Sequence, residues 1–352
     1  MKQYELRDLG WQPHFEQQVA VDELDSCMAG RVCAHYGSHV LFLTETGEVS
    51  IPSALVEVKD ENRSGSTLAI GDWLLLDASD HRIIRRLERK TVLSRKAAGD
   101  TVKPQLIAAN VDTVFIVSSC NQDFNPSRLE RYLAVVLESE SVPIVILTKS
   151  DLHDDPASLR QIAESLHPGL IVETIDARDR EQSETLNHWC GVGKTIAMLG
   201  SSGVGKSTLA NAMCDLSIKT SSIREDDAKG RHTTTARSMH RLTAGGWLID
   251  NPGMRELQLA DCEQGVADLF DDIIRIAEDC RFRNCSHRGD EGCALHAAVE
   301  SGELEERRLT NYLKLQSEQA RNAASLAERR EQDRRLGKFY KSVISEKQRR
   351  RQ

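Results

Sequence analysis

The chain has 352 residues, enough for two or three domains of about 100–200 residues each, and its formal net charge is −8. Its composition, with 39% hydrophobic and 28% charged residues, is that of a globular protein and excludes wholesale disorder. The sequence has no apolar run near the roughly 18 residues of a membrane span, no signal-peptide segment and no disulfide-type cysteine pattern, so we expect a cytoplasmic protein without membrane association.

The first hundred residues contain short β-type runs separated by glycines. We expect strands at Arg31–Tyr36, His39–Thr44, Val49–Ile51, Trp73–Leu76 and Ile83–Leu87. Short strands at this spacing favour a small barrel of the OB type.

From about residue 110, apolar runs alternate with helical patterns. The expected strands are Asp112–Ser118, Val142–Leu147, Leu170–Thr174 and Thr195–Leu199, and the expected helices span 126–139 and 156–166. This alternation predicts a parallel sheet covered by helices on both faces.

Beyond residue 265 the pattern becomes mainly helical, with one long helix starting near Glu303. We therefore predict three domains: an N-terminal extension and barrel over 1–100, an α/β domain over 101–269, and a helical domain with a basic tail over 270–352.

Basic residues gather in two segments. Residues 321–352 hold eleven Lys and Arg against four acids, and residues 82–103 hold eight against two. Such segments on an acidic protein indicate contact with a polyanion, although a solvated helix face explains the charge equally well.

Residues 200–207, Gly-Ser-Ser-Gly-Val-Gly-Lys-Ser, match the Walker A pattern of a phosphate-binding loop. The backbone N–H groups of such a loop bind phosphate, its lysine reaches the β- and γ-phosphates, and its serine binds Mg²⁺. A strand should precede the loop and a helix should follow it. The residues expected to contact nucleotide are Gly200, Ser201, Ser202, Gly203, Val204, Gly205, Lys206, Ser207 and Thr208. We assign Lys206 a catalytic role, and Ser207 a role as a magnesium ligand.

A base-recognition motif follows the strand that ends near residue 147. Thr148, Lys149, Ser150 and Asp151 resemble the Asn-Lys-x-Asp motif of GTPases, with threonine in the asparagine position. A carboxylate here can accept two N–H groups from guanine, a donor pair that adenine lacks, so Asp151 predicts GTP. In the segment 174–177, Ala177 would donate its backbone N–H to guanine O6, although an aspartate precedes it where GTPases usually carry serine.

Two segments after the phosphate loop resemble nucleotide-sensing switches. Residues 230–235 would supply Thr234 to Mg²⁺, while Asp250 would hold Mg²⁺ through water and Gly253 would donate its N–H to the γ-phosphate. Met254 stands where Ras-type enzymes place the glutamine that orients water. His232 is our candidate for that role, and a contact of His232 with RNA is an equal alternative.

Three cysteines and a histidine occur within fourteen residues: Cys280, Cys285, His287 and Cys293. Thiolate and imidazole ligands of this number suit one structural Zn²⁺ in a reducing compartment. The alternative is a set of unrelated reduced cysteines.

The guanine motif precedes the phosphate loop and the switches, whereas ordinary GTPases place it last. The order is therefore that of a circularly permuted GTPase. Together these motifs resemble the RsgA/YjeQ family of GTPases that depend on the small ribosomal subunit.

The resemblance implies an OB barrel, a permuted GTPase core and a zinc-binding helical domain. It implies a factor for late maturation of the small (30S) subunit that binds the subunit and its rRNA, and whose hydrolysis of GTP to GDP with Mg²⁺ is stimulated by the subunit. We expect a monomer. Two other functions remain open at this point: a P-loop ATPase or kinase acting on a small molecule, and an RNA-binding zinc protein with a vestigial nucleotide site.

Overall fold

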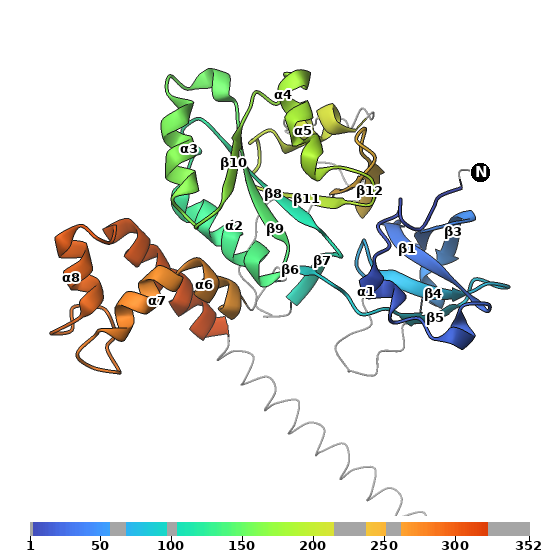
Figure 1. The fold of residues 1–352 in the computed structure, drawn as a ribbon, viewed down its shortest axis with the longest axis horizontal. Helices are drawn as coiled ribbons and strands as arrows, with labels where there is room; N and C mark the ends of the chain where they lie inside the picture. The colour runs from blue at the N-terminus through green and yellow to red at the C-terminus, as the bar shows by residue number, and fades with distance from the viewer. Residues whose placement is uncertain (1–2, 57–67, 97–103, 215–236, 251–261, 323–352) are drawn as a thin grey trace, which may run out of the picture. The chain divides into compact units, whose positions relative to one another are not determined.

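The computed structural model describes residues 3–56, 68–96, 104–214, 237–250 and 262–322 (Figure 1). The chain divides into two compact units, one made of residues 1–95 and 106–257 and the other of residues 96–105 and 258–352. The finer division into three domains stays a prediction. In the described ranges, no helix combines the length and the apolar character needed to cross a membrane.

The N-terminal part of the first unit is an antiparallel β structure. Its strands are β1 (Cys27–His35), β2 (His39–Thr44), β3 (Gly47–Pro52), β4 (Trp73–Asp77) and β5 (Ile83–Arg86). They pair in the order β3-β2-β1-β4-β5, as in a partly open five-stranded barrel, which confirms the expected class. Phe15, from the short helix α1 (Pro13–Glu16), and Phe42 and Trp73, from the strands, are fully buried in it. Two 3₁₀ turns, η1 (Val21–Glu23) and η2 (Ser53–Leu55), complete this part.

A groove of about 840 Å³ lies along the open side of this barrel. It is lined by residues 49–52 of β3 and by residues 80–84 at the start of β5. Within the described residues no pairing joins β3 to β5, so the groove follows from the incomplete closure of the sheet.

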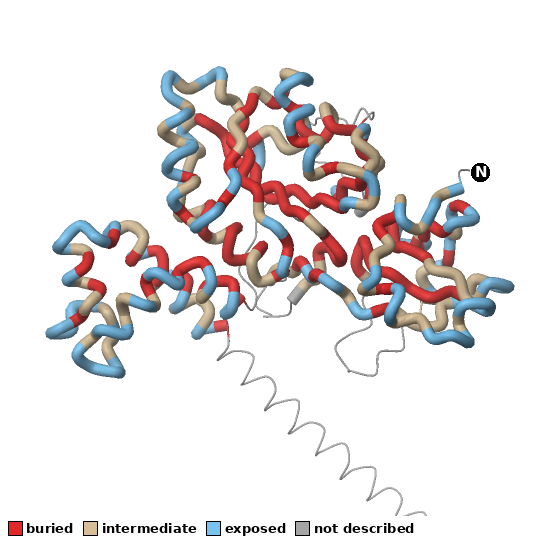
Figure 2. Tube along the Cα trace, in the orientation of Figure 1, coloured by how far each residue is buried: buried red, intermediate tan, exposed pale blue. Residues whose placement is uncertain are grey.

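The central part is the predicted α/β structure. Its strands are β8 (Thr113–Ser119), β9 (Val142–Thr148), β10 (Ile171–Thr174), β11 (Thr195–Leu199), β12 (Arg237–Arg241) and β13 (Trp247–Asp250). They lie in the order β10-β9-β8-β11-β13-β12, and all are parallel except β12. The four inner strands β9, β8, β11 and β13 are buried along most of their length (Figure 2), as expected of a sheet covered on both faces.

Four helices cover this sheet. They are α2 (Pro126–Glu138), α3 (Pro156–Glu164), α4 (Arg180–Glu184) and α5 (Lys206–Met213). The first two lie together on one face and the last two on the other (Figure 1). Helix α2 begins where expected because Asn125 caps it, accepting the N–H of Arg128, and because Pro126 is favoured at the first helical position.

Strand β1 takes part in both β structures. Its first residues pair with β4 as far as Arg31, and its last two, Ala34 and His35, pair with Ser238 and Arg237 of β12. A bulge between Val32 and Ala34 accompanies the change of partner. The barrel and the core therefore form one continuous sheet of eleven strands.

A buried arginine reinforces this junction. The guanidinium of Arg31 donates to the carbonyls of Leu9 and Asn110 and, at 2.8 Å, to the Thr195 hydroxyl at the start of β11. Burial lowers the pKa of Arg31 to about 10. Two further strands, β6 (Val92–Lys96) and β7 (Pro104–Ala109), pair with each other.

The second unit is helical, as predicted. It contains α6 (Glu263–Leu269), α7 (Asp271–Glu278), α8 (Ala294–Ser301) and a helix over 306–322. Among its described residues, Leu269, Phe270, Ile273, Leu295 and Leu315 are the fully buried apolar side chains.

Candidate nucleotide site and metal-binding cluster

The predicted phosphate loop connects β11 to α5, as the sequence required. Gly200 has a φ of 147°, and a Cβ atom there would lie 2.2 Å from the carbonyl oxygen of Val117. Gly205 has a φ of 100° and directly precedes α5. Both positions favour glycine because their φ angles are positive, and position 200 also because the backbone of β8 leaves no room for a Cβ atom.

The Lys206 ammonium lies against its own loop. It donates to the carbonyl oxygen of Gly200 at 2.6 Å and to that of Ser201. Ser202, Gly203 and Ser207 are exposed, Thr208 is half-buried, and Val204 is buried beneath the loop. An ammonium in this position can exchange carbonyl acceptors for phosphate oxygens.

Thr148 lies behind the loop and is completely buried. Its hydroxyl lies 3.0 Å from the carbonyl oxygen of Ser118 and also contacts that of Val204. A hydroxyl has one proton, so it donates to one of these carbonyls at a time. Threonine in this position thus links the end of β9 to the phosphate loop.

The other residues of the predicted guanine motif lie at the end of β9. Lys149 adopts a left-handed conformation with φ 56°, and the 3₁₀ turn η3 (Ser150–Leu152) follows. Ala177 is buried in the loop after β10. β9 and β10 are adjacent and parallel, so both loops lie at one edge of the sheet.

An arginine that the sequence analysis did not single out joins these two loops. The Arg178 guanidinium donates to Asp151 Oδ2 at 2.7 Å and to Asp176 Oδ2 at 2.9 Å. The hydrogen bonds from Arg178 lower the pKa of the Asp176 carboxyl, and Asp176 in turn raises the pKa of Arg178. The aspartate at position 176, which departs from the GTPase pattern, was the one sequence signal for such a partner.

A second arginine reaches the phosphate loop from α2. Arg128 Nη1 lies 2.7 Å from Ser201 Oγ and 2.7 Å from Asp123 Oδ1. No sequence signal pointed to this contact, because Arg128 and Ser201 are 73 positions apart.

The structure describes one of the predicted switch residues, Asp250. Asp250 ends β13 with an exposed side chain. Since β13 is parallel and adjacent to β11, this carboxylate lies at the edge of the sheet that carries the phosphate loop. His232, Thr234 and Gly253 lie outside the described residues, and their roles stay predictions.

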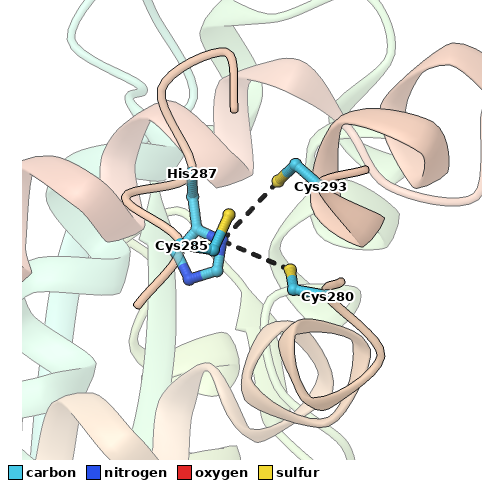
Figure 3. A group of neighbouring side chains, drawn as sticks. All are labelled: Cys280, Cys285, His287 and Cys293. Carbon is cyan, nitrogen blue, oxygen red and sulfur yellow. Dashed lines mark hydrogen bonds between the residues drawn. The ribbon is translucent and has the colours of Figure 1, made fainter. Parts of the chain in front are cut away.

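The four predicted metal ligands converge between α7 and α8 (Figure 3). The Sγ atoms of Cys280 and Cys293 each lie 3.6 Å from His287 Nδ1, and all four ligand atoms lie within 4.8 Å of one another. Ligands of tetrahedral zinc are about 3.5–3.8 Å apart, given metal–ligand bonds of about 2.0–2.3 Å. The Ala294 N–H donates to Cys280 Sγ at 3.3 Å. The cluster could therefore hold a metal ion.

Comparison with known proteins gives the family. The model of the RsgA GTPase family matches residues 86–260. The small ribosomal subunit biogenesis GTPase RsgA 2 of Vibrio parahaemolyticus is 49% identical over 99% of this chain and 95% of its own. The chain belongs to the RsgA GTPase family. A second RsgA relative, from Mesorhizobium japonicum, is 43% identical over 90% of each chain.

Solved structures agree with the permuted arrangement. YjeQ from Thermotoga maritima has a TM-score of 0.59 and 25% identity, and the match covers 84% of this chain and 99% of that one. YloQ, described as a circularly permuted GTPase, has a TM-score of 0.58 and 23% identity over 84% of this chain and 95% of that one. The fold class predicted from the sequence is confirmed. As an RsgA-family member, the protein is a GTP hydrolase.

Proposed function

We propose that this protein binds the small ribosomal subunit and assists its late maturation, hydrolysing GTP at a rate that the subunit stimulates. The proposal rests on how much of the chain matches its relatives. A relative named a small ribosomal subunit biogenesis GTPase matches 99% of this chain, including the barrel and the helical unit. A likeness confined to the GTPase core would support nucleotide hydrolysis alone.

In this proposal each part of the nucleotide site has one task. The phosphate loop and Lys206 hold the phosphates, and Ser207, Thr234 and Asp250 hold Mg²⁺, which would stabilise the charge that develops on the phosphates. Asp151 and Ala177 recognise guanine. Support comes from the described residues of this set: Asp151, Ala177, the phosphate loop and Asp250 follow or end β9, β10, β11 and β13, at one edge of the sheet.

We infer that the metal of the helical unit is one Zn²⁺. Three thiolates and one imidazole are soft donors that favour zinc over Mg²⁺ or Ca²⁺. A closed set of four protein ligands is typical of a structural site.

Ribosomal RNA is the proposed contact of the barrel. The groove beside β3 and β5 includes His81 and Arg82, and its rim carries Leu55, which is 69% exposed. A groove with a cation and apolar surface suits an RNA strand, as in other OB folds. The predicted monomeric state and cytoplasmic location belong to the same proposal.

The test is hydrolysis of GTP and of ATP with and without purified small subunits. We expect the subunits to accelerate GTP hydrolysis and to leave ATP unhydrolysed. The Lys206→Ala variant should lose at least about 100-fold in stimulated turnover, because the phosphates would lose the ammonium that stabilises their negative charge. Lys194→Ala is the matched control, since Lys194 follows a similar Gly-Val-Gly segment but is exposed and lies before β11.

Other outcomes would contradict the proposal in different ways. Equal hydrolysis of ATP would favour the ATPase or kinase alternative. GTP turnover that stays undetectable with subunits present would favour an RNA-binding zinc protein with a vestigial site.

A further inference from the structure

The carboxylate proposed to recognise guanine, Asp151, has an internal partner in the protein. Arg178 Nη2 lies 2.7 Å from Asp151 Oδ2. The two residues belong to different loops, after β10 and after β9, and are 27 positions apart. The contact thus crosses the place where the base is proposed to bind.

Asp176 holds the arginine in this orientation. Its Oδ2 accepts from Arg178 Nη2 at 2.9 Å, and its Oδ1 accepts from Nε at 3.0 Å and from the backbone N–H of Arg178 at 3.0 Å. The Asp176 N–H is itself fixed by Gln182 Oε1 at 2.9 Å. The serine usual at position 176 in GTPases has no charge with which to anchor a guanidinium in this way.

A guanidinium and the recognised edge of guanine have the same chemistry. The N1, C2 and N2 atoms of guanine form a guanidine fragment that presents two parallel N–H donors. Arginine carries N–H donors of the same kind; here Arg178 Nη2 donates to Asp151, while Nε and Nη2 together engage Asp176. Guanine would use both oxygens of Asp151, and Arg178 Nη2 donates to one of them, Oδ2, so the arginine and the base compete for that oxygen.

We propose that Arg178 determines guanine affinity by competing with the base for Asp151, so that nucleotide binds only by displacing an internal mimic of guanine. This inference rests on the proposed function, because it takes Asp151 as the guanine-binding residue.

The competition is expected to be modest and sensitive to salt. The Arg178 side chain is 68% exposed and that of Asp151 is 34% exposed. Exposed ion pairs are weak and screened by salt, so the base can displace Arg178 readily. The result is a modestly lowered affinity for GDP and GTP alike, because both carry the same base.

The test is calorimetric titration of the nucleotide-free full-length protein with GDP and with ADP, at low and high salt. The Arg178→Ala variant should bind GDP about three-fold more tightly than the wild type at low salt, which is the size expected for loss of an exposed ion pair. The difference should shrink at high salt. Arg180→Ala is the matched control, because Arg180 is equally exposed, pairs with Glu184 and does not touch Asp151; its GDP affinity should equal that of the wild type.

The possible outcomes distinguish a failure of this inference from a failure of the proposed guanine site. Unchanged or weaker GDP binding by Arg178→Ala would overturn the competition, and Arg178→Gln would repeat the measurement if the alanine variant were poorly folded. Wild-type protein that binds ADP as well as GDP, or Asp151→Ala that binds GDP normally, would overturn the proposed guanine site and the inference together. Selective GDP binding that depends on Asp151 but is not tightened by Arg178→Ala would overturn the inference alone.

Discussion

The buried hydroxyl of Thr148 lies between strand β8 and the predicted phosphate loop and contacts both. On one side lies the carbonyl of Ser118 in β8, and on the other the carbonyl of Val204 in the phosphate loop. Because Thr148 also precedes the turn that we propose recognises guanine, one side chain links this turn to the predicted phosphate loop.

Replacing Thr148 with valine tests this coupling. Valine has nearly the same shape but no donor, so a buried carbonyl would lose its partner at a cost of about 1–3 kcal/mol in unfolding free energy. We also expect weaker GDP binding, since the phosphate loop would be held less firmly. Urea unfolding and GDP titration measure both effects, with Thr148→Ser as the control that keeps the hydroxyl. Wild-type stability and affinity in the valine variant would contradict this role.

At the residue scale, the sequence identified groups whose chemistry is local. Gly200 and Lys206 were predictable because the loop pattern itself demands a left-handed backbone and a cation. The roles of Arg128 and Arg178 were not, because each depends on a contact made only after distant loops meet. Asp176 departs from the serine of the GTPase pattern, but only the folded structure shows that its partner is Arg178.

Among the elements, the predicted metal cluster lies between the two packed helices α7 and α8. Cys280 follows the end of α7, and Cys293 directly precedes α8, while Cys285 and His287 lie in the intervening loop. Bound metal would therefore fix the angle between α7 and α8 and add to the stability of a small helical unit.

We expect one zinc ion per purified chain. Changing Cys293 to serine should remove it and lower the helical content of this unit, because a hydroxyl is a poor zinc ligand. Elemental analysis and circular dichroism provide the measurements. Cys262→Ser is the matched control: Cys262 is buried in the same unit but lies outside the cluster. Full zinc content in Cys293→Ser would refute the assignment.

Element prediction succeeded where the hydrophobic pattern was strong. The run 142–147 and the Leu129–Leu133 spacing correspond to β9 and α2 within a residue at either end. Strand β12, Arg-Ser-Met-His-Arg, was missed because it has a single apolar residue. It forms a strand because β13 and β1 pair with it on either side, which is a tertiary cause.

At the scale of the whole molecule, the barrel and the GTPase core are one unit. The sequence predicts a boundary between them near residue 100, because short strands separated by glycines give way there to alternating strands and helices. It carried no information on the pairing of β1 with β12, nor on the burial of Arg31 between the two parts.

This arrangement predicts how the protein melts. In scanning calorimetry the barrel and the core should unfold in one cooperative transition, and the helical unit in another. GDP at about 100 times its Kd should stabilise the first transition by about 2.7 kcal/mol, because it binds that unit alone, and should leave the second unchanged. A separate barrel transition that ignores GDP would show that the shared strand does not couple the two parts.

The pairing of β1 with β12 also bears on how the protein avoids self-association. The last strand of an open sheet presents unpaired N–H and C=O groups that invite strands of other chains. Among the described strands of the GTPase part, β10 and β12 are outermost, and Ala34 and His35 of β1 cover part of the free side of β12. The barrel therefore protects this edge of the core against edge-to-edge aggregation, and a core expressed without it would expose β12 to the strands of other chains.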